Sequence, residues 1–289
     1  MIPGKFEYLV PATLDEAVSM LTEHGYDAKI LAGGQSLIPA MRFRLAVPEI
    51  LVDINRIDGL SYIKEAGGYL VIGAMTRESD VDESDLVKQK YPLLADTARV
   101  IADPLVRNMA TVGGNLAHAD PANDHPATML AYKAEIVGIG PDGERVIPID
   151  DFFVGLFENS LADNEILKEV RIPTPPANSG GAYLKIERKV GDYAIAATAV
   201  QLTLNGNICT AARIGLTNVA PVPMRATNAE AAIVGKELTE ENIKAAGAAA
   251  AAECDPSPDL RGSVEYKRDL VRVVTIRAIR AAAERAKGV

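Results

Sequence analysis

Two segments with paired glycines could bind an anionic ligand in this chain of 289 residues. Residues 32–36 are Ala-Gly-Gly-Gln-Ser, and residues 111–115 are Thr-Val-Gly-Gly-Asn. Paired glycines let the backbone turn sharply and let a ligand approach without a Cβ in the way, while successive N–H groups at a strand-to-helix turn bind anions. One such turn alone is more often structural. Two of them in one domain suggest a ligand with two adjacent phosphates.

A long polar segment, residues 103–125, surrounds the second pair of glycines. We expect it to be irregular. Ordering it would cost about 1–2 kcal/mol of backbone entropy per residue, so a segment of this kind usually serves as a binding loop. The sequence leaves two interpretations of Asp124 equal: its carboxylate binds a ribose or ribityl hydroxyl, or it caps a helix that starts at Pro126.

Acid–base and nucleophilic groups are scarce in the chain. His118 and His125 are seven residues apart, which is not a recognised metal-ligand spacing, and we expect both in a solvated loop. Cys209 and Cys254 are isolated, so this chain alone cannot build a disulfide framework, a cysteine-held zinc site or an iron–sulfur site. No serine lies in a GxSxG motif, the nucleophile elbow of hydrolases. The sequence therefore predicts no catalytic nucleophile or general base and no metal ligand.

Two further signals each have competing interpretations. Residues 138–143 match GxGxxG, but Pro-Asp-Gly leads into a β-like run instead of a helix, so we interpret the match as a hairpin turn. Tyr193 follows a stretch of charges and a glycine that interrupts a strand pattern. Its ring could lie against a planar ligand, although simple packing at a strand bulge is the commoner case.

The first half of the chain alternates apolar runs with amphipathic stretches, as in an α/β domain. A capping box at residues 13–16 opens a helix that ends at Gly25, and residues 92–102 have helical spacing. Tight-turn residues predict two hairpins, so the sheet should be mixed. The expected strands are residues 6–10, 29–32, 50–53, 62–65 paired with 69–72, and 134–139 paired with 144–149.

A domain boundary is predicted at residues 171–181, where three prolines and two glycines exclude a continuous helix or central strand. Three apolar runs follow, the last two joined by Asn-Gly, and predict an antiparallel sheet. Two helical stretches come last, and in the second of them Leu270, Val273, Val274 and Ala281 fall on one stripe. The apolar runs are residues 182–188, 195–204 and 208–216, and the helical stretches are residues 240–254 and 265–286.

The chain has 39 acidic and 30 basic residues and a formal charge of −9. Its lysines and arginines are scattered, which argues against nucleic-acid binding because a phosphate-binding surface needs a basic face. No basic and apolar leader opens the sequence, and no stretch reaches the ~18 apolar residues of a membrane helix. We therefore expect a cytoplasmic protein without membrane insertion.

The two glycine motifs, in this order and separation, resemble those of the FAD-binding subunits of the molybdenum hydroxylases, the xanthine dehydrogenase family. The likeness runs nearly end to end and is greatest to the medium chains of the carbon monoxide dehydrogenase branch. The motifs are specific for the flavoprotein family and much less specific for the substrate. Similar stretches are residues 1–6 (MIPGKF), 101–104 (IADP), 191–194 (GDYA) and 215–220 (GLTNVA).

The resemblance implies an α+β fold, with a two-part FAD-binding domain of the vanillyl-alcohol oxidase type followed by a C-terminal domain of antiparallel sheet plus helices. We expect the first domain at residues 1–177, with subdomains of about 1–56 and 57–177, and the second at residues 178–289. In the family the glycine loops hold the FAD pyrophosphate, and Tyr193 matches the residue that covers the isoalloxazine. Gln35 stands where a histidine is common, a change that should spare phosphate binding by the backbone. The implied FAD contacts are Ala32, Gly33, Gly34, Gln35, Ser36, Leu37, Ile101, Ala102, Thr111, Gly113, Gly114, Asn115, Asp124, Leu167, Lys185 and Tyr193.

The resemblance also implies partners. A small subunit with [2Fe–2S] clusters would deliver electrons from a large subunit with the molybdenum cofactor, in a dimer of heterotrimers. The terminal acceptor would be a quinone or cytochrome, as the carbon monoxide dehydrogenase branch implies, or NAD, which no second dinucleotide fingerprint in the sequence favours. Flavin chemistry needs positioning more than acid–base groups, which accounts for the scarce histidines. Peripheral contact with the inner membrane through the complex is left open.

Three alternatives to this function remain open from the sequence. The chain could be the medium subunit of an N-heterocycle or aldehyde hydroxylase, because medium chains of these enzymes look alike. It could be a free-standing FAD oxidoreductase that binds its own substrate. It could also be a non-enzymatic nucleotide-binding module.

Overall fold

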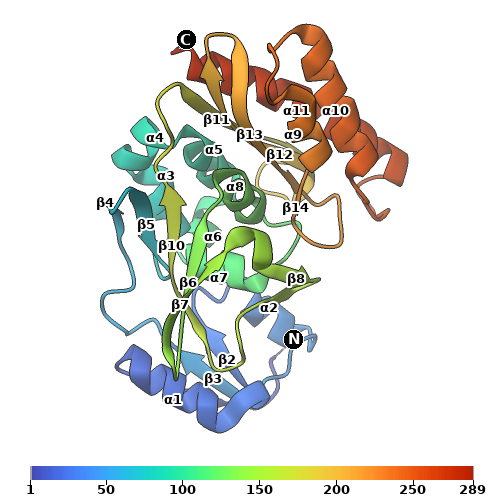
Figure 1. Cartoon of the computed structure of the whole chain (residues 1–289). Coiled ribbons are helices and arrows are strands. Elements are labelled where there is room, and N and C mark those ends of the chain that lie inside the picture. The colour runs from blue at the N-terminus through green and yellow to red at the C-terminus, as the bar shows by residue number, and fades with distance from the viewer. Residues whose placement is uncertain (1, 289) are drawn as a thin grey trace.

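A small parallel sheet with a helix packed against it forms the N-terminal part of the molecule (Figure 1). The computed structural model describes residues 2–288. β3 (Ile50–Asp53) lies between β1 (Glu7–Leu9) and β2 (Ala28–Leu31) and is parallel to both. The predicted cap of α1 (Leu14–His24) is confirmed, because the Thr13 side chain accepts a hydrogen bond from the Glu16 N–H at 3.2 Å. A 3-10 turn (Gly25–Asp27) and α2 (Leu37–Arg42) complete this part.

The central sheet has five antiparallel strands in the order β4-β5-β10-β6-β7. Both predicted hairpins are present, and the GxGxxG match is the β6–β7 hairpin, in which Gly140 pairs with Gly143. The middle strand, β10, was not among the expected elements because a bulge between Leu167 and Glu169 breaks its alternation. The strands are β4 (Ile63–Ala66), β5 (Tyr69–Gly73), β10 (Ile166–Pro173), β6 (Glu135–Gly140) and β7 (Gly143–Pro148).

Six helices connect β5 to β6 and carry the second glycine motif. The prediction that residues 103–125 are irregular was wrong: they contain two short helices and the start of a third. These helices are too short to show a hydrophobic period, but each of the two has a side-chain cap: the Asp103 carboxylate accepts from Val106 N–H, and the Thr111 hydroxyl accepts from Gly114 N–H. The six are α3 (Glu78–Glu83), α4 (Asp85–Lys90), α5 (Pro92–Val100), α6 (Pro104–Arg107), α7 (Val112–His118) and α8 (Asp124–Tyr132).

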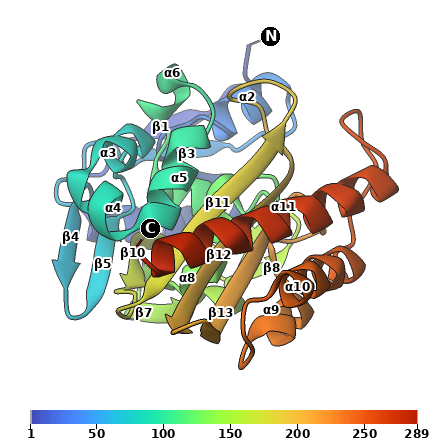
Figure 2. The same cartoon turned by 90° about the horizontal axis from the view of Figure 1, so that it is seen from above.

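The C-terminal sheet is antiparallel, as predicted, with the order β11-β12-β13-β14. One face packs on α5 and α8, and the other is covered by α9 and α11 (Figures 1 and 2). Because both faces are covered, β12 is buried along almost its whole length. The strands are β11 (Ser179–Glu187), β12 (Ala194–Asn205), β13 (Ile208–Thr217) and β14 (Met224–Arg225), and the helices are α9 (Thr227–Ile233), α10 (Glu240–Glu253) and α11 (Val264–Ala286).

The buried stripe of α11 differs from the predicted one. Of the four predicted residues only Val274 is buried, and the observed stripe contains Val271, Ala278 and Ala282 as well. The helix contacts the sheet on one side and α10 on another, so its buried surface is wider than one heptad pattern suggests and is rotated from it. No helix within residues 2–288 is both long and apolar enough to cross a membrane.

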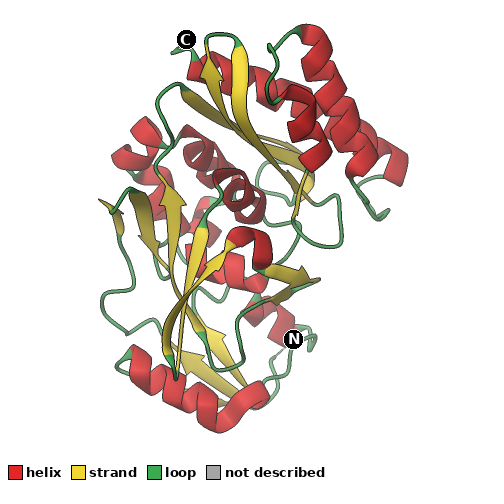
Figure 3. Cartoon of the chain, in the orientation of Figure 1, coloured by secondary structure: helices red, strands yellow, loops and turns green. Residues whose placement is uncertain are grey.

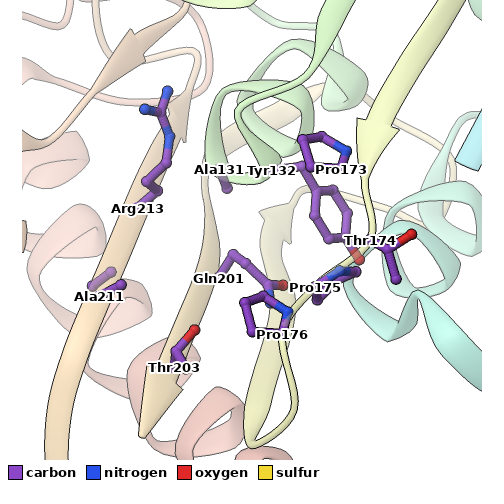
Figure 4. A pocket seen from close by; sticks show the side chains of 11 residues that line it. Ala131, Tyr132, Pro173, Thr174, Pro175, Pro176, Gln201, Thr203, Ala211 and Arg213 are labelled. Carbon is purple, nitrogen blue, oxygen red and sulfur yellow. The ribbon is translucent and has the colours of Figure 1, made fainter. Parts of the chain in front are cut away.

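The two halves of the chain share a hydrophobic core. α8 is buried at all nine positions between the central sheet and the C-terminal sheet (Figure 3). The core cluster around it includes Tyr183 of β11 and Ala197 of β12. Next to this junction the proline-rich connection between β10 and β11 passes over Tyr132 and leaves a cavity of about 130 Å³, walled by β12 and β13 (Figure 4).

A two-stranded ribbon, β8 (Phe153–Gly155) with β9 (Glu158–Asn159), follows a 3-10 turn (Ile149–Asp151).

Candidate functional site

A cavity of about 1020 Å³ lies where the three parts of the chain meet. Its size is at the upper end of the roughly 300–1,000 Å³ of small-molecule and cofactor sites. All sixteen residues that the resemblance implied as FAD contacts line this single cavity. Sequence positions from 21 to 193 contribute to the walls, so the fold and not local sequence brings these residues together.

The first glycine loop (residues 32–36) turns the chain from β2 into α2. Gly34 has φ +72°, a conformation that favours glycine, and the Gln35 side-chain amide donates to the Gly33 carbonyl at 3.0 Å. In the described part of the chain no protein acceptor meets the backbone N–H groups of Gly33, Gly34, Gln35 and Ser36. These donors are therefore available to a ligand in the cavity.

The second glycine loop (residues 111–115) has a different character. Its N–H groups are bonded within the protein: Gly113 N–H donates to Ala74 O at 2.9 Å, Gly114 N–H to Thr111 Oγ1 at 3.1 Å, and Asn115 N–H to Thr111 O at 2.9 Å. The loop instead offers a surface without side chains and the buried Oδ1 of Asn115, which has no hydrogen-bond partner among the described residues. The two loops are thus unequal, although the sequence suggested two similar anion sites.

The glycine loops touch one another. A Cβ on Gly33 would lie 2.2 Å from the carbonyl oxygen of Met109, just before the second loop. A Cβ on Gly114 would meet the Thr111 hydroxyl at 2.8 Å and the Ala32 side chain at 3.6 Å. Glycine is therefore required at position 33 for close approach of the two backbones, and at position 114 it leaves the space between the loops open.

A buried ionic cluster lies at another end of the cavity. Lys185 of β11 donates to Asp124 Oδ2 at 2.9 Å and to the Val100 carbonyl at 3.0 Å, and Tyr183 donates its hydroxyl to Asp124 Oδ1 at 2.6 Å. Burial raises the pKa of Asp124, while Lys185 and the Tyr183 hydroxyl oppose that rise. Burial and the carboxylate of Asp124 raise the pKa of Tyr183 well above its ordinary value.

The interpretation of Asp124 as a helix cap was wrong. α8 begins at Asp124 and not at Pro126, its N-cap residue is Asn123, and no side chain caps it. The carboxylate instead accepts a hydrogen bond from Lys185, 61 residues later in the sequence. Tyr183 is not among the residues predicted from the sequence. It lies two positions before Lys185 on the same strand, so the two-residue period of a strand places both side chains on one face and could have indicated it.

Tyr193 lies at the cavity wall with 44% of its surface exposed. It belongs to the turn between β11 and β12, in which Gly191 has φ +82° and abuts the carbonyl of Ala102. The neighbouring Asp192 forms an ion pair with Arg261 at 2.7 Å, which ties this turn to the segment before α11. Burial, Asp120 and Asp124 raise the pKa of Tyr193, so the residue presents a neutral phenol ring to the cavity.

The prediction of solvated histidines was wrong. His125 is fully buried, and its Nε2 lies 2.7 Å from Glu78 Oε2, 47 residues earlier in sequence. His118 lines the cavity against the ring of Phe157, at 5.1 Å between ring centroids, and burial lowers its pKa. His118 lies in α7 and His125 in α8, and these helices, present in place of the expected loop, account for the full burial of His125 and the partial burial of His118. Within residues 2–288 no cluster of three or more His, Cys, Asp or Glu side chains could hold a metal ion.

FAD fits the residues of this cavity. Its dianionic pyrophosphate matches the unpaired N–H groups of the first loop and the open space at Gly114. Its hydroxyl groups match the orphaned acceptor of Asn115, and its planar ring matches the Tyr193 wall beside Lys185. The second loop then serves as a wall close to the phosphates more than as a set of backbone donors.

Comparisons with known proteins agree with this fit. Residues 4–175 match the family model for the FAD binding domain in molybdopterin dehydrogenase, and residues 181–282 match that for the CO dehydrogenase flavoprotein C-terminal domain. The chain is 47% identical to the carbon monoxide dehydrogenase medium chain of Hydrogenophaga pseudoflava, over 98% of both chains. It is 45% identical to that of Afipia carboxidovorans, over 99% of this chain and 100% of the relative. A solved carbon monoxide dehydrogenase from Hydrogenophaga pseudoflava, lacking the Mo-pyranopterin moiety, matches with a TM-score of 0.96 at 49% identity, over 98% of both chains.

Proposed function

The chain belongs to the family of FAD-binding chains of molybdopterin dehydrogenases, and on this premise we propose that it is the medium subunit of a carbon monoxide dehydrogenase. In this role it carries FAD and passes electrons from the [2Fe–2S] clusters of a partner subunit to a terminal acceptor. The observation that carries the proposal is the single cavity that both glycine loops and all the other implied FAD contacts line together.

FAD, when bound, supplies a ring that takes up and releases electrons. The protein's own residues bind and orient it. The first glycine loop would hold the pyrophosphate with its free N–H groups, and Asn115 Oδ1 would accept from a cofactor hydroxyl. We place the ring near Tyr193 and Lys185, because both line the cavity and the Asp124 carboxylate that pairs with Lys185 also raises the pKa of Tyr193. Asp124 and the Val100 carbonyl fix the position of the Lys185 ammonium, which would then lie near the ring.

Partner subunits follow from the chemistry that this chain lacks. An iron–sulfur cluster needs four ligands that are mostly cysteines, and the chain has two, both buried and in different elements. We propose that a small [2Fe–2S] subunit and a large molybdenum-containing subunit join it in a dimer of heterotrimers. We further propose a quinone or cytochrome as the terminal acceptor, because the GxGxxG match is a hairpin and offers no second dinucleotide site.

The reducing substrate tests this proposal directly. In the purified complex under anaerobic conditions, carbon monoxide should bleach the flavin absorption, whereas N-heterocycles and aldehydes should leave it oxidised. Bleaching by an N-heterocycle or aldehyde and not by carbon monoxide would move the chain to another branch of the family. A complex that has no flavin spectrum after FAD is supplied would contradict the flavoprotein assignment itself.

Replacing Tyr193 tests the placement of the ring. We expect Tyr193→Ala to retain FAD and to shift the flavin midpoint potential and absorption maxima, because an aromatic face that is replaced by water changes the surroundings of the ring. The measurement is a spectroelectrochemical titration of the complex. Tyr266→Ala is the matched control, since Tyr266 is 47% exposed but is not part of the cavity wall. Equal potentials in wild type and Tyr193→Ala would remove Tyr193 from the site.

A further inference from the structure

We propose that Arg77 and Asn55 form a polar bridge that fixes the separation of the two glycine loops and thereby sets the affinity for FAD. Neither residue lines the cavity, so both act as positioning residues through the loops they hold. The inference rests on the proposed function in one respect, that the cavity binds FAD. We call this pair the loop bridge.

Asn55 forms the end of the bridge that holds the first loop. It follows β3, and its Nδ2 donates to the carbonyl oxygens of Ala32 at 2.8 Å and Leu31 at 3.3 Å. The same Nδ2 contacts Asp53 Oδ1 at 2.6 Å, and Asp53 in turn accepts from the hydroxyl of Tyr8. These partners are all acceptors, so the amide must point its nitrogen at the first loop and leave its oxygen free.

Arg77 forms the end that holds the second loop. Its Nη2 donates to the free oxygen of Asn55 at 2.9 Å, and its Nη1 donates to the carbonyl of Met109. The backbone of Arg77 pairs with Thr111 in an isolated antiparallel bridge. An arginine is only a donor, which fixes the orientation of the Asn55 amide a second time. One guanidinium therefore connects the first loop, through the Asn55 amide, with Met109, which lies two residues before the second loop.

The two loops belong to different parts of the fold, so a contact between them can set their separation. The first loop extends from the small parallel sheet, whereas the second is fastened to the residues that follow β5 of the central sheet, by hydrogen bonds from Val112 N–H to Thr76 O and from Gly113 N–H to Ala74 O. A pyrophosphate between the loops is gripped well only at one separation. The planar fork of arginine reaches two acceptors in fixed directions, which a lysine cannot do.

The positive charge of Arg77 should also increase the affinity for the anionic cofactor. Among the residues that line the cavity, the lysines and arginines are Lys29 and Lys185. Neither glycine loop contains a lysine or an arginine. Arg77 adds a positive charge that contacts Met109 next to the second loop and Asn55 next to the first. Because Asn55 is exposed and Arg77 is only half-buried, removing either side chain disturbs little of the core.

The test compares Arg77→Met, Asn55→Ala and the double variant, each as the full chain in its native assembly after removal of FAD. Each single variant should bind FAD roughly 10-fold more weakly, since a hydrogen bond to a charged group is lost. The double variant should be no more than about 2-fold weaker than either single one, because the bridge is already broken by the first change. ADP, which carries the pyrophosphate without the flavin, should lose affinity by the same factor.

Arg280→Met and Asn242→Ala are the matched controls. Arg280 likewise donates from two nitrogens, to Glu240 on the surface of the C-terminal part, and Asn242 donates to Glu237 O at 2.8 Å. Both controls should bind FAD and ADP as the wild type does. Thermal midpoints equal to those of the controls would show that the bridge variants lose affinity and not fold; if Arg77→Met fails to fold, Asn55→Ala alone carries the comparison.

Three results would overturn the loop bridge. They are wild-type affinity for FAD in both single variants, effects that multiply in the double variant, and full recovery of affinity in Arg77→Lys, which keeps the charge without the two-pronged fork. Failure of the wild-type assembly to bind FAD would contradict the proposed function instead, so the two failures are distinct.

Discussion

Gly114→Val is expected to abolish FAD retention while the chain still folds. The first atom of the new side chain would lie 2.8 Å from the Thr111 hydroxyl and 3.6 Å from Ala32, so the branched side chain fills the space between the two glycine loops. Overpacking of this kind typically costs about 1–3 kcal/mol, which alone weakens binding by roughly 5- to 150-fold. The measurement is the flavin-to-protein ratio of the purified complex.

Gly114→Ala provides the graded control for this prediction. Its single methyl group meets the Thr111 hydroxyl at close range but does not extend further between the loops, so we expect partial occupancy between those of wild type and Gly114→Val. Both variants should still fold, with a thermal midpoint only modestly below that of the FAD-free wild type, because Gly114 lies outside the buried core and its Cβ displaces only the Thr111 hydroxyl. Wild-type flavin content in Gly114→Val would show that the cofactor does not pass between the loops.

Lys185→Met is expected to destabilise the fold by about 3–5 kcal/mol, because it leaves the buried carboxylate of Asp124 without its cation. The loss should be smaller at low pH. Burial already raises the pKa of Asp124, and without Lys185 that pKa rises further, so the folded variant binds a proton more tightly than the unfolded chain and gains stability as the pH falls. Denaturant unfolding at several pH values measures both effects.

Two further variants test the ionic origin of this destabilisation. Asp124→Asn combined with Lys185→Met removes both charges and should recover most of the lost stability, since a buried pair that is replaced as a whole costs little. Lys168→Met removes the cation of a more exposed ion pair, with Glu144, and should cost about 0–1 kcal/mol. Equal losses in Lys168→Met and Lys185→Met, or no recovery in the double variant, would contradict the buried-pair explanation.

Features specified by neighbouring residues could be predicted from the sequence. The Thr13 cap, the β6–β7 hairpin and the Asn-Gly turn between β12 and β13 each depend on a few adjacent residues, and each is present. The glycine motifs likewise marked both loops. Bonding within the second loop, however, depends on carbonyls at positions 74 and 76, and no property of the motif itself indicates that its N–H groups are already used.

Features specified by distant residues could not be predicted. The partner of His125 is Glu78, and that of Asp124 is Lys185, so the burial of all four depends on how α3, α8 and β11 pack. Short helices such as α6 and α7 carry too few residues for a period to appear. The loop bridge is the extreme case, because an asparagine and an arginine on the surface carry no signal until the two loops they hold are known.

The core that surrounds α8 has a consequence for how this protein can be divided. The two family models separate at residues 175 and 181, but the hydrophobic cluster continues across that point from α8 into β11 and β12. Residues 178–289 on their own would expose the sheet face that α8 and α5 cover, and residues 1–177 would lack Lys185 and Tyr193. The boundary between the two family models therefore does not separate two independent hydrophobic cores. The cofactor cavity is complete only when both regions pack against α8.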